Sequence, residues 1–400
     1  MVIKMIIREH YIEKIREFYD SDLIKIITGI RRCGKSVILE EIRDEIAKKS
    51  DNIIYLNFED EILSSSICNC DGLLKYVDEH KKSGKAYLFF DEIQEIDNWQ
   101  KACKTLRLHN NSVFISGSNS KILSREFTRE FSGRYVSFRV RPFVYKEILE
   151  YSKELGIEAS IMDYLIWGGF PKRFEFNTDD ARNRYLSDLN NTIIYNDLIN
   201  RYNIKNENLF KRMVDYVLKS NGRVFSTRSI ETYLKGEKIS GSINTIISYL
   251  DHLEEAFIID KIAPFNTKTK EDLKYYFKLY DADVSLNSIR QLSGRFDLTH
   301  NLENIVYNEL LYMDYEVKVF NNDDKGIDFL AIKNNKKYYI QVAYTIVEEK
   351  NYEREFRVFN NLDNDSKKII ITNDDFDYST ANVKHIKLKD FLLMDNLDNI

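Results

Sequence analysis

The sequence is poor in proline and tryptophan, with three and two of them among its 400 residues. So few prolines, together with a hydrophobic content of 43%, indicate a globular chain without long disordered linkers. A chain of this length has room for two or three domains, each able to bury its own core. The four cysteines lack the paired spacing of zinc sites, which predicts reduced thiols of a cytoplasmic protein: Cys33, Cys68, Cys70 and Cys103.

Long apolar runs and an excess of positive charge are also missing from the sequence. No apolar stretch approaches the length of a membrane span. The N-terminal segment carries acidic residues and lacks the small-residue cleavage site of a secretory signal. The net charge of −5 gives no global basic signature for nucleic acid or an anionic membrane. We therefore expect a cytoplasmic protein that does not contact a membrane.

Residues Gly29 to Ser36 fit the phosphate-binding pattern G-x-x-x-x-G-K-[ST]. An apolar stretch at 24–28 predicts a buried strand before the pattern, and Val37 to Ile46 predicts a helix after it. Backbone N–H groups of such a loop, with the helix N-terminus, form a site of positive potential. Lys35 would reach the β and γ phosphates, and the Ser36 hydroxyl would ligate Mg²⁺. The pattern predicts that the chain binds a nucleoside triphosphate.

A second motif consists of an apolar run that ends in two carboxylates, Asp91 and Glu92. A continuous apolar run is typical of a buried parallel strand, and ligand groups lie just beyond the carboxyl ends of such strands. Asp91 would hold Mg²⁺ through its water shell, and Glu92 would orient and deprotonate the attacking water. The pair predicts an ATPase site.

A third strand is expected at 112–117 and is followed by Ser118 and Asn119. Either side chain could hydrogen-bond the attacking water or the γ-phosphate, or the segment could be a turn in which Ser118 or Ser120 caps the next helix. Arg125, Arg129 and Arg134 follow, and an arginine supplied by a neighbouring subunit can stabilise the transition state of phosphoryl transfer. Arg134, next to a glycine, is the preferred candidate. Such an arrangement would require a homo-oligomer.

The pattern of elements divides the chain into three blocks. Residues 1–150 alternate strands and helices, with strands expected near 24–28, 53–58, 86–91, 112–117 and 135–140, which predicts an α/β, doubly wound nucleotide-binding domain. Residues 151–290 are mainly helical, and the part at 207–280 is typical of a winged helix, with helices at Thr227–Lys235 and Ser242–Ala256. Residues 291–400 return to mixed helix and strand, with strands near 316–320, 327–332, 337–344 and 368–372.

The chain resembles, over nearly its full length, the bacterial and archaeal P-loop ATPases that pair an AAA-type domain with a C-terminal DUF4143 region. The resemblance rests on TGIRRCGKS, NFED at 57–60, LFFDEIQ at 88–94, SGSNS at 116–120, SGRY at 132–135 and GGFP at 168–171. It implies ATP and Mg²⁺ as cofactors, with Ser36 and Asp91 at the metal. It also implies that Lys35, Asp91 and Glu92 are catalytic. The implied nucleotide contacts are Gly29, Ile30, Arg31, Arg32, Cys33, Gly34, Lys35, Ser36 and Val37.

By the same resemblance, the last block looks like a restriction-endonuclease core. Its site positions fall on Glu303, Asp328, Gln341 and Ala343. Metal-assisted cleavage needs carboxylates for the metal and a cation for the developing charge, but Ala343 supplies no cation and Gln341 no negative charge. Residues 301–400 also carry 13 Lys and Arg against 19 Asp and Glu, a balance that repels a polyanion. We expect a degenerate nuclease-like scaffold without cleavage activity.

The winged-helix segment is also a weak candidate for DNA binding. Its second helix, Ser242–Ala256, contains no Lys or Arg and carries three acids, Asp251, Glu254 and Glu255. DNA contact could come only from the lysines of the expected wing: Lys261, Lys268, Lys270, Lys274 and Lys278. The acids of this helix, the acidic C-terminal block and the missing lysine at 343 favour a protein partner over DNA.

The sequence thus predicts an ATP-binding protein, an Mg²⁺-dependent ATPase whose hydrolysis drives a conformational or assembly cycle on a protein or nucleic-acid partner. Two alternatives stay open. One is a nucleotide-gated switch or scaffold with slow turnover, and the other is an ATP-regulated DNA-acting protein with a degenerate nuclease domain.

Overall fold

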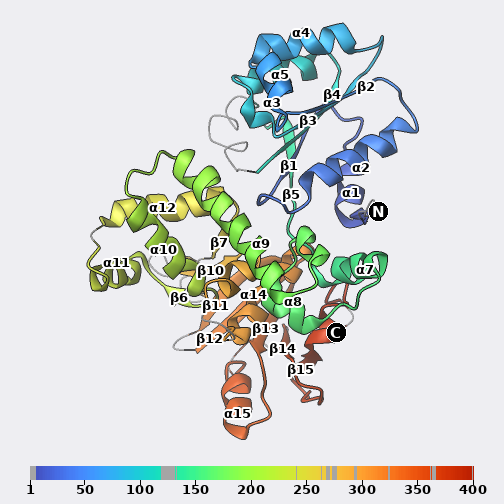
Figure 1. Ribbon diagram of the computed structural model, residues 1–400. Coiled ribbons are helices and arrows are strands. Elements are labelled where there is room, and N and C mark those ends of the chain that lie inside the picture. The colour runs from blue at the N-terminus through green and yellow to red at the C-terminus, as the bar shows by residue number, and fades with distance from the viewer. Residues whose placement is uncertain are drawn as a thin grey trace. The chain divides into compact units, whose positions relative to one another are not determined.

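The computed structural model describes residues 6–118, 131, 133–239, 241–262, 264–266, 271–272, 277–291, 295–322, 325–360, 362, 366–398 and 400. The chain forms two compact units (Figure 1). The first runs to Pro142 and includes Glu255–Phe257, and the second comprises Phe143–Glu254 and Ile258–Ile400. The second unit therefore holds both later blocks of the sequence, and a boundary between them near residue 290 stays a prediction.

The first unit is built on a parallel sheet of order β2-β3-β4-β1-β5. Strands β1 and β4 are buried along their whole length, because each is an almost continuous apolar run covered on both faces. All five expected strands form, and the predicted α/β class is confirmed for this unit. The strands are β1 Ile24–Thr28, β2 Ile53–Asn57, β3 Tyr87–Asp91, β4 Ser112–Gly117 and β5 Tyr135–Arg139.

Helices cover this sheet by burying one apolar face each. Helix α2 turns Ile38, Leu39, Ile42 and Ile46 inward at helical spacing. Helix α4 begins at an N-cap, where the Asn69 side chain accepts from the Gly72 N–H. The helices are α1 Glu9–Arg16, α2 Lys35–Ala47, α3 Glu61–Ser66, α4 Cys70–His80 and α5 Trp99–Leu108, with a 3₁₀ turn at Ile93–Glu95.

The second unit begins with a helical part and contains two sheets. Its helices are α7 Tyr145–Leu155, α8 Ile161–Trp167, α9 Asp179–Thr192, α10 Glu207–Lys219, α11 Thr227–Gly236, α12 Ile243–Glu255, α13 Ser285–Ser288, α14 Leu298–Tyr312, α15 Glu349–Arg357 and α16 Leu388–Phe391. A 3₁₀ segment, Pro171–Glu175, follows α8, and a π-helical segment, Ile193–Asn200, continues α9.

A small antiparallel sheet of order β6-β10-β7 accompanies α10, α11 and α12. Its strands are β6 Val224–Phe225, β7 Ile259–Ile262 and β10 Phe277–Asp281. The two helices expected at 227–235 and 242–256 are present as α11 and α12, and the winged-helix interpretation of the segment stays a prediction.

The larger sheet is mixed and has the order β15-β14-β13-β12-β11-β8-β9. Strands β11, β12 and β13 form an antiparallel meander, whereas β13, β14 and β15 are parallel. Helix α14 packs against β10 and the meander. The strands are β8 Pro264–Asn266, β9 Glu271–Asp272, β11 Glu316–Asn322, β12 Lys325–Lys333, β13 Lys336–Ala343, β14 Lys367–Thr372 and β15 Lys384–Lys387.

The Gly168-Gly169 pair has a packing role in the second unit. A Cβ at Gly168 (φ 68°) would lie 1.8 Å from Oδ1 of Asp283, and one at Gly169 would lie 2.0 Å from the Phe143 carbonyl oxygen. The Gly169 N–H donates to Asp283 at 2.6 Å, and the Phe143 N–H donates to the Gly169 carbonyl at 2.8 Å. Only glycine admits these approaches, so the GGFP motif serves the fold.

The two wing lysines that the structure describes, Lys261 and Lys278, are both engaged by carboxylates. Lys261, on β7, pairs with Asp251 and Glu254 of α12, and Lys278, on β10, is buried in ion pairs. Both ammonium groups are thus neutralised by carboxylates of the chain itself, and Lys278 cannot meet a phosphate backbone. The remaining three, Lys268, Lys270 and Lys274, lie outside the described residues.

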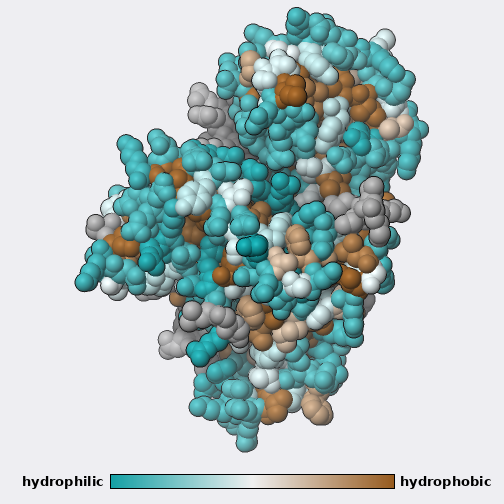
Figure 2. Space-filling model, in the orientation of Figure 1, coloured by the Kyte–Doolittle hydropathy of each residue, from teal (hydrophilic) through white to brown (hydrophobic). Residues whose placement is uncertain are grey.

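In the part of the chain that the structure describes, no helix is long and apolar enough to cross a bilayer. On the face drawn in Figure 2, apolar residues form small separate patches among hydrophilic ones.

Glu309 of α14 is a buried carboxyl that anchors the start of α7. Its Oε1 accepts from the Tyr145 N–H at 2.9 Å and from the Tyr164 hydroxyl at 3.5 Å. Burial raises the pKa of Glu309 to about 8, with the nearby Glu147 adding to the rise. The carboxyl is therefore protonated in the native state at neutral pH.

This raised pKa predicts a pH-dependent stability for the second unit. Native Glu309 keeps its proton up to about pH 8, whereas the unfolded chain loses it near its ordinary pKa of 4.5. The native state binds more protons between these values, so stability falls as pH rises, by at most about 1.4 kcal/mol per unit. Glu309→Gln should flatten this slope in urea unfolding. An unchanged slope in the variant would contradict the assignment.

Candidate active site

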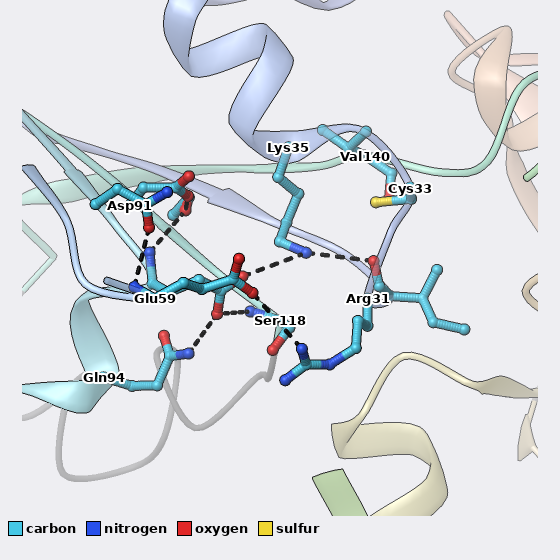
Figure 3. A network of polar contacts seen from close by, with 12 residues as sticks. Arg31, Cys33, Lys35, Glu59, Asp91, Gln94, Ser118 and Val140 are labelled. Carbon is cyan, nitrogen blue, oxygen red and sulfur yellow. Dashed lines mark hydrogen bonds and ion pairs between the residues drawn. The ribbon is translucent and has the colours of Figure 1, made fainter. Parts of the chain in front are cut away.

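The loop between β1 and α2 is held in place by a close backbone approach. Gly29 has φ 146°, and a Cβ at this position would lie 2.2 Å from the Val140 carbonyl oxygen that follows β5. Gly34 (φ 100°) and Arg32 (φ 66°) also have left-handed conformations. The Cys33 thiol donates to the same Val140 carbonyl at 3.4 Å, and burial raises its pKa. Cys33 therefore supports the loop from behind (Figure 3).

Arg8 also holds the loop in place, through hydrogen bonds to two backbone carbonyls. Its Nη1 donates to the Cys33 carbonyl at 2.8 Å, and its Nη2 donates to the Arg141 carbonyl at 2.9 Å. The side chain is almost fully buried, and hydrogen bonds from a charged donor are worth about 1.5–3 kcal/mol each. Arg8 thereby keeps a loop carbonyl turned outward. The sequence offered no signal for this role, because a lone arginine before a helix has no motif.

Lys35 lies at the centre of the site and is 5% exposed. Its ammonium nitrogen is 3.3 Å from the Ile30 carbonyl oxygen and 3.8 Å from Oε1 of Glu92 (Figure 3). The cation therefore lies between the phosphate loop and the end of β3. Ser36 and Val37 follow it on the first turn of α2 and are half-buried.

Asp91 ends β3 and is fixed by hydroxyl groups on the two neighbouring strands. Ser116 of β4 donates a short hydrogen bond to its Oδ1, and the Tyr55 hydroxyl of β2 donates to its Oδ2 at 3.4 Å. Ser116 also accepts from the Glu92 N–H at 3.2 Å. Sequence reasoning missed both hydroxyls, although the place of Ser116 on the strand before Ser118 is a usable signal.

Glu92 is a buried, ionised carboxylate in a strained backbone conformation, with φ 50°. Its Oε2 accepts a short hydrogen bond from the Gln94 amide and one of 3.3 Å from the Ser118 N–H. Burial acts to raise its pKa, but Lys35, the Gln94 amide and Arg31 outweigh burial and lower it. A carboxylate kept ionised in this way is able to accept a proton.

Two further predicted residues flank this cluster. The Ser118 hydroxyl is buried and has no hydrogen-bond partner among the described residues. Nη1 of Arg31 lies 3.6 Å from Oε1 of Glu59, a residue of the NFED motif, and both side chains are partly exposed. Such an exposed pair contributes little to stability.

The remaining ATPase-site predictions are not tested by this geometry. Arg134 is exposed at the start of β5. Asn119, Arg125 and Arg129 lie outside the described residues, as does Ser120, the alternative helix cap.

A magnesium ion fits the donor set of this site. Among the described residues, no three His, Cys, Asp or Glu side chains converge on a metal position. Mg²⁺ nevertheless keeps several waters and binds through one or two protein oxygens plus substrate phosphates. The Asp91 carboxylate and the Ser36 hydroxyl are oxygen donors of this kind at the two edges of the loop site.

The predicted nuclease-like residues lie in the second unit. Glu303 is on α14, Asp328 on β12, and Gln341 and Ala343 on β13. Oε1 of Gln341 accepts from the Asp328 N–H at 3.2 Å, so these two are brought together.

Among the described residues, all four cysteines are free thiols.

Comparison with known proteins identifies relatives of the whole chain. Residues 21–149 match the family described as AAA domain, and residues 158–296, which make up most of the predicted helical and winged-helix block, match a domain of unknown function, DUF8612. These two matches do not show the DUF4143 region that the sequence led us to expect at 291–400. An uncharacterized protein of Haemophilus influenzae is 34% identical over 381 residues, covering 92% of this chain and 93% of that protein. The uncharacterized protein MJ1544 of Methanocaldococcus jannaschii is 31% identical over 378 residues, covering 88% and 82%.

Among solved structures, the Walker-type ATPase PABY2304 of Pyrococcus abyssi is similar, with a TM-score of 0.52 and 15% identity over 73% of this chain and 99% of that one. At this identity the likeness establishes a shared fold.

The position of Lys35 predicts how its replacement affects ATP binding. Lys35→Ala should abolish tight ATP binding, because it removes the point charge that meets the β and γ phosphates. Isothermal titration calorimetry with ATP measures the effect, and Lys104→Ala, an exposed lysine of α5, is the matched control. Equal affinities of the Lys35→Ala variant and the parent would rule this role out.

Proposed function

The chain belongs to the family of the Haemophilus influenzae and Methanocaldococcus jannaschii proteins and carries an AAA-type P-loop domain, and on this premise we propose that it hydrolyses ATP with Mg²⁺. One observation carries the proposal. Lys35 of the phosphate loop and the ionised Glu92 lie 3.8 Å apart, next to an Asp91 that two hydroxyls fix in place. Phosphate binding, metal binding and proton acceptance are thus available at one point.

The loop and the N-terminus of α2 would hold the triphosphate. Their backbone N–H groups would face the phosphate oxygens, and Lys35 would exchange the Ile30 carbonyl and Glu92 for the β and γ phosphates. Ser36 and Asp91 would hold Mg²⁺, which when bound neutralises charge that develops on the phosphate oxygens. Arg8 keeps the loop in shape while this exchange takes place.

Glu92 would take the proton of the attacking water. Gln94 and the Ser118 N–H hold one of its carboxylate oxygens, which leaves the oxygen that faces Lys35 to accept the proton. Ser118, whose buried hydroxyl is unpartnered among the described residues, would contact the water or the γ-phosphate. Asn119 is the alternative residue for this contact.

Arg134 would act as the arginine finger of a neighbouring copy. Its exposure fits a residue that works outside its own subunit. The active site would then be complete only in a homo-oligomer.

Hydrolysis is tested by removing the charge of the proposed base. Glu92→Gln should keep Mg·ATP bound while multiple-turnover phosphate release slows by about a hundredfold or more, because an amide cannot accept the proton. Glu95→Gln, an exposed carboxylate in the same turn, is the control and should turn over at the parental rate. Parental turnover by Glu92→Gln would transfer the role to Ser118 or Asn119.

A nucleotide-gated switch with slow turnover is the second candidate function. The observation that favours it is that Gln94, Lys35 and the Ser118 N–H all hold the Glu92 carboxylate. A base held by three partners reacts slowly until nucleotide or a partner releases it. Multiple-turnover phosphate release with and without DNA separates this switch from an ATPase that acts on nucleic acid.

We propose that the partner of this chain is a protein rather than DNA. Helix α12, the second helix of the proposed winged helix, contains no Lys or Arg, and Lys261 is paired with its acids. The last hundred residues carry 13 basic against 19 acidic residues. A surface of this sign repels a phosphate backbone at long range.

We further propose that residues 291–400 are a degenerate, restriction-endonuclease-like domain of the DUF4143 type that does not cut DNA. Ala343 supplies no cation, and the Gln341 amide is engaged by the Asp328 N–H and by Glu355. Purified protein should leave supercoiled plasmid intact with Mg²⁺ or Mn²⁺, with and without ATP. Metal-dependent nicking that Asp328→Ala abolishes would overturn this expectation, and nicking only with ATP would identify a gated nuclease.

A further inference from the structure

Three elements of the second unit meet at the ammonium group of Lys278. Its Nζ, at the end of a side chain from β10, lies 2.9 Å from Oε1 of Glu303 on α14 and 2.9 Å from Oδ1 of Asp328 on β12. All three side chains are close to fully buried, with 11%, 10% and 13% exposed. Two carboxylates from separate elements thus converge on one positive charge.

The same two carboxylates accept further hydrogen bonds. The Tyr280 hydroxyl donates to Oε1 of Glu303 at 2.7 Å, and the Val342 N–H donates to Oδ2 of Asp328 at 3.0 Å. Oε2 of Glu303 lies near the turn at Gly222, where an added Cβ would be 3.4 Å from it. Gln341 donates to Glu355 at 2.8 Å and keeps that third carboxylate apart from the pair.

The cation is required by the electrostatics of the cluster. Burial raises the pKa of Glu303, and the Asp328 carboxylate adds to the rise, whereas Lys278 opposes it. Burial alone would lower the pKa of Lys278, but Asp328 and Glu303 outweigh it and raise that pKa. Two ionised carboxylates that face one buried point repel each other unless a cation lies between them.

From this geometry we propose that Lys278 is a built-in cation that occupies the position a divalent metal ion would take between Glu303 and Asp328. Converging carboxylate oxygens are the ligands that Mg²⁺ and Mn²⁺ prefer, and these ions need only one or two of them besides water. The ammonium satisfies both carboxylates and excludes a metal from the site. It also ties β10, and with it the small β6-β10-β7 sheet, to α14 and the larger sheet.

The proposal predicts that removing the ammonium opens a metal site. Lys278→Ala leaves two carboxylates and a space of lysine size, so the full-length variant should bind one equivalent of Mn²⁺ at least tenfold more tightly than the parent does. Electron paramagnetic resonance of free Mn²⁺, without nucleotide, measures the binding. Lys278→Arg keeps the charge and should gain no Mn²⁺ site.

Two further variants identify the ligands and control for loss of any lysine. The gain in Mn²⁺ affinity should disappear in the double variant Lys278→Ala/Asp328→Asn, because one of the two carboxylates is gone. Lys261→Ala is the matched control, since Lys261 also bridges two carboxylates, Asp251 at 2.9 Å and Glu254 at 3.3 Å, but on one exposed helix. It should gain no tight site.

Several outcomes would overturn the proposal. One is parental Mn²⁺ binding that Asp328→Asn abolishes, and another is folded Lys278→Ala that binds no more Mn²⁺ than the parent. If Lys278→Ala is unfolded without metal, Mn²⁺ should restore its circular dichroism spectrum in an Asp328-dependent way. Failure of Mn²⁺ to restore folding, while Lys278→Arg folds, also contradicts the proposal.

Discussion

The first unit depends on one close contact, the packing of Gly29 against the Val140 carbonyl. A side chain at Gly29 would come within 2.2 Å of that oxygen, so the contact sets the distance between the start of the loop and the end of β5. Arg8, through the Cys33 carbonyl, and the Cys33 thiol, through the Val140 carbonyl, then hold the loop in place. With its carbonyls held from behind, the loop can present its N–H groups and Lys35 toward the ends of β3 and β4.

Two buried lysines organise the two units, and their surroundings give them opposite roles. Lys35 has one carboxylate at 3.8 Å and one carbonyl at 3.3 Å, which are loose partners that a triphosphate can replace. Lys278 has two carboxylates at 2.9 Å, and all three side chains are close to fully buried. A lysine ammonium group therefore has a different role in each unit. Lys35 can exchange its partners for a ligand, whereas Lys278 links elements of the second unit.

The sequence predicted the parts of the structure that depend on local pattern. Strands β1, β3 and β4, the loop and the carboxylates at 91–92 follow from apolar runs and a short motif, so each is readable without its neighbours. Arg8, Tyr55 and Ser116 could not be predicted, because they act on residues that lie far away in the chain. Lys278 was named among the lysines that could contact DNA, and its engagement could not be predicted for the same reason: its partners are on α14 and β12.

The location of a cation decides what it does to a carboxylate site. The sequence lacks a lysine at Ala343, the position at which the proposed nuclease-like site would carry its cation. The structure has a lysine at Lys278 instead, between the carboxylates, where its single positive charge offsets part of their negative charge. A cation beside the pair would leave both oxygens free for a metal, whereas a cation between them consumes both. Counting charged residues in the C-terminal block cannot distinguish these cases, and only the three-dimensional position of Lys278 does so.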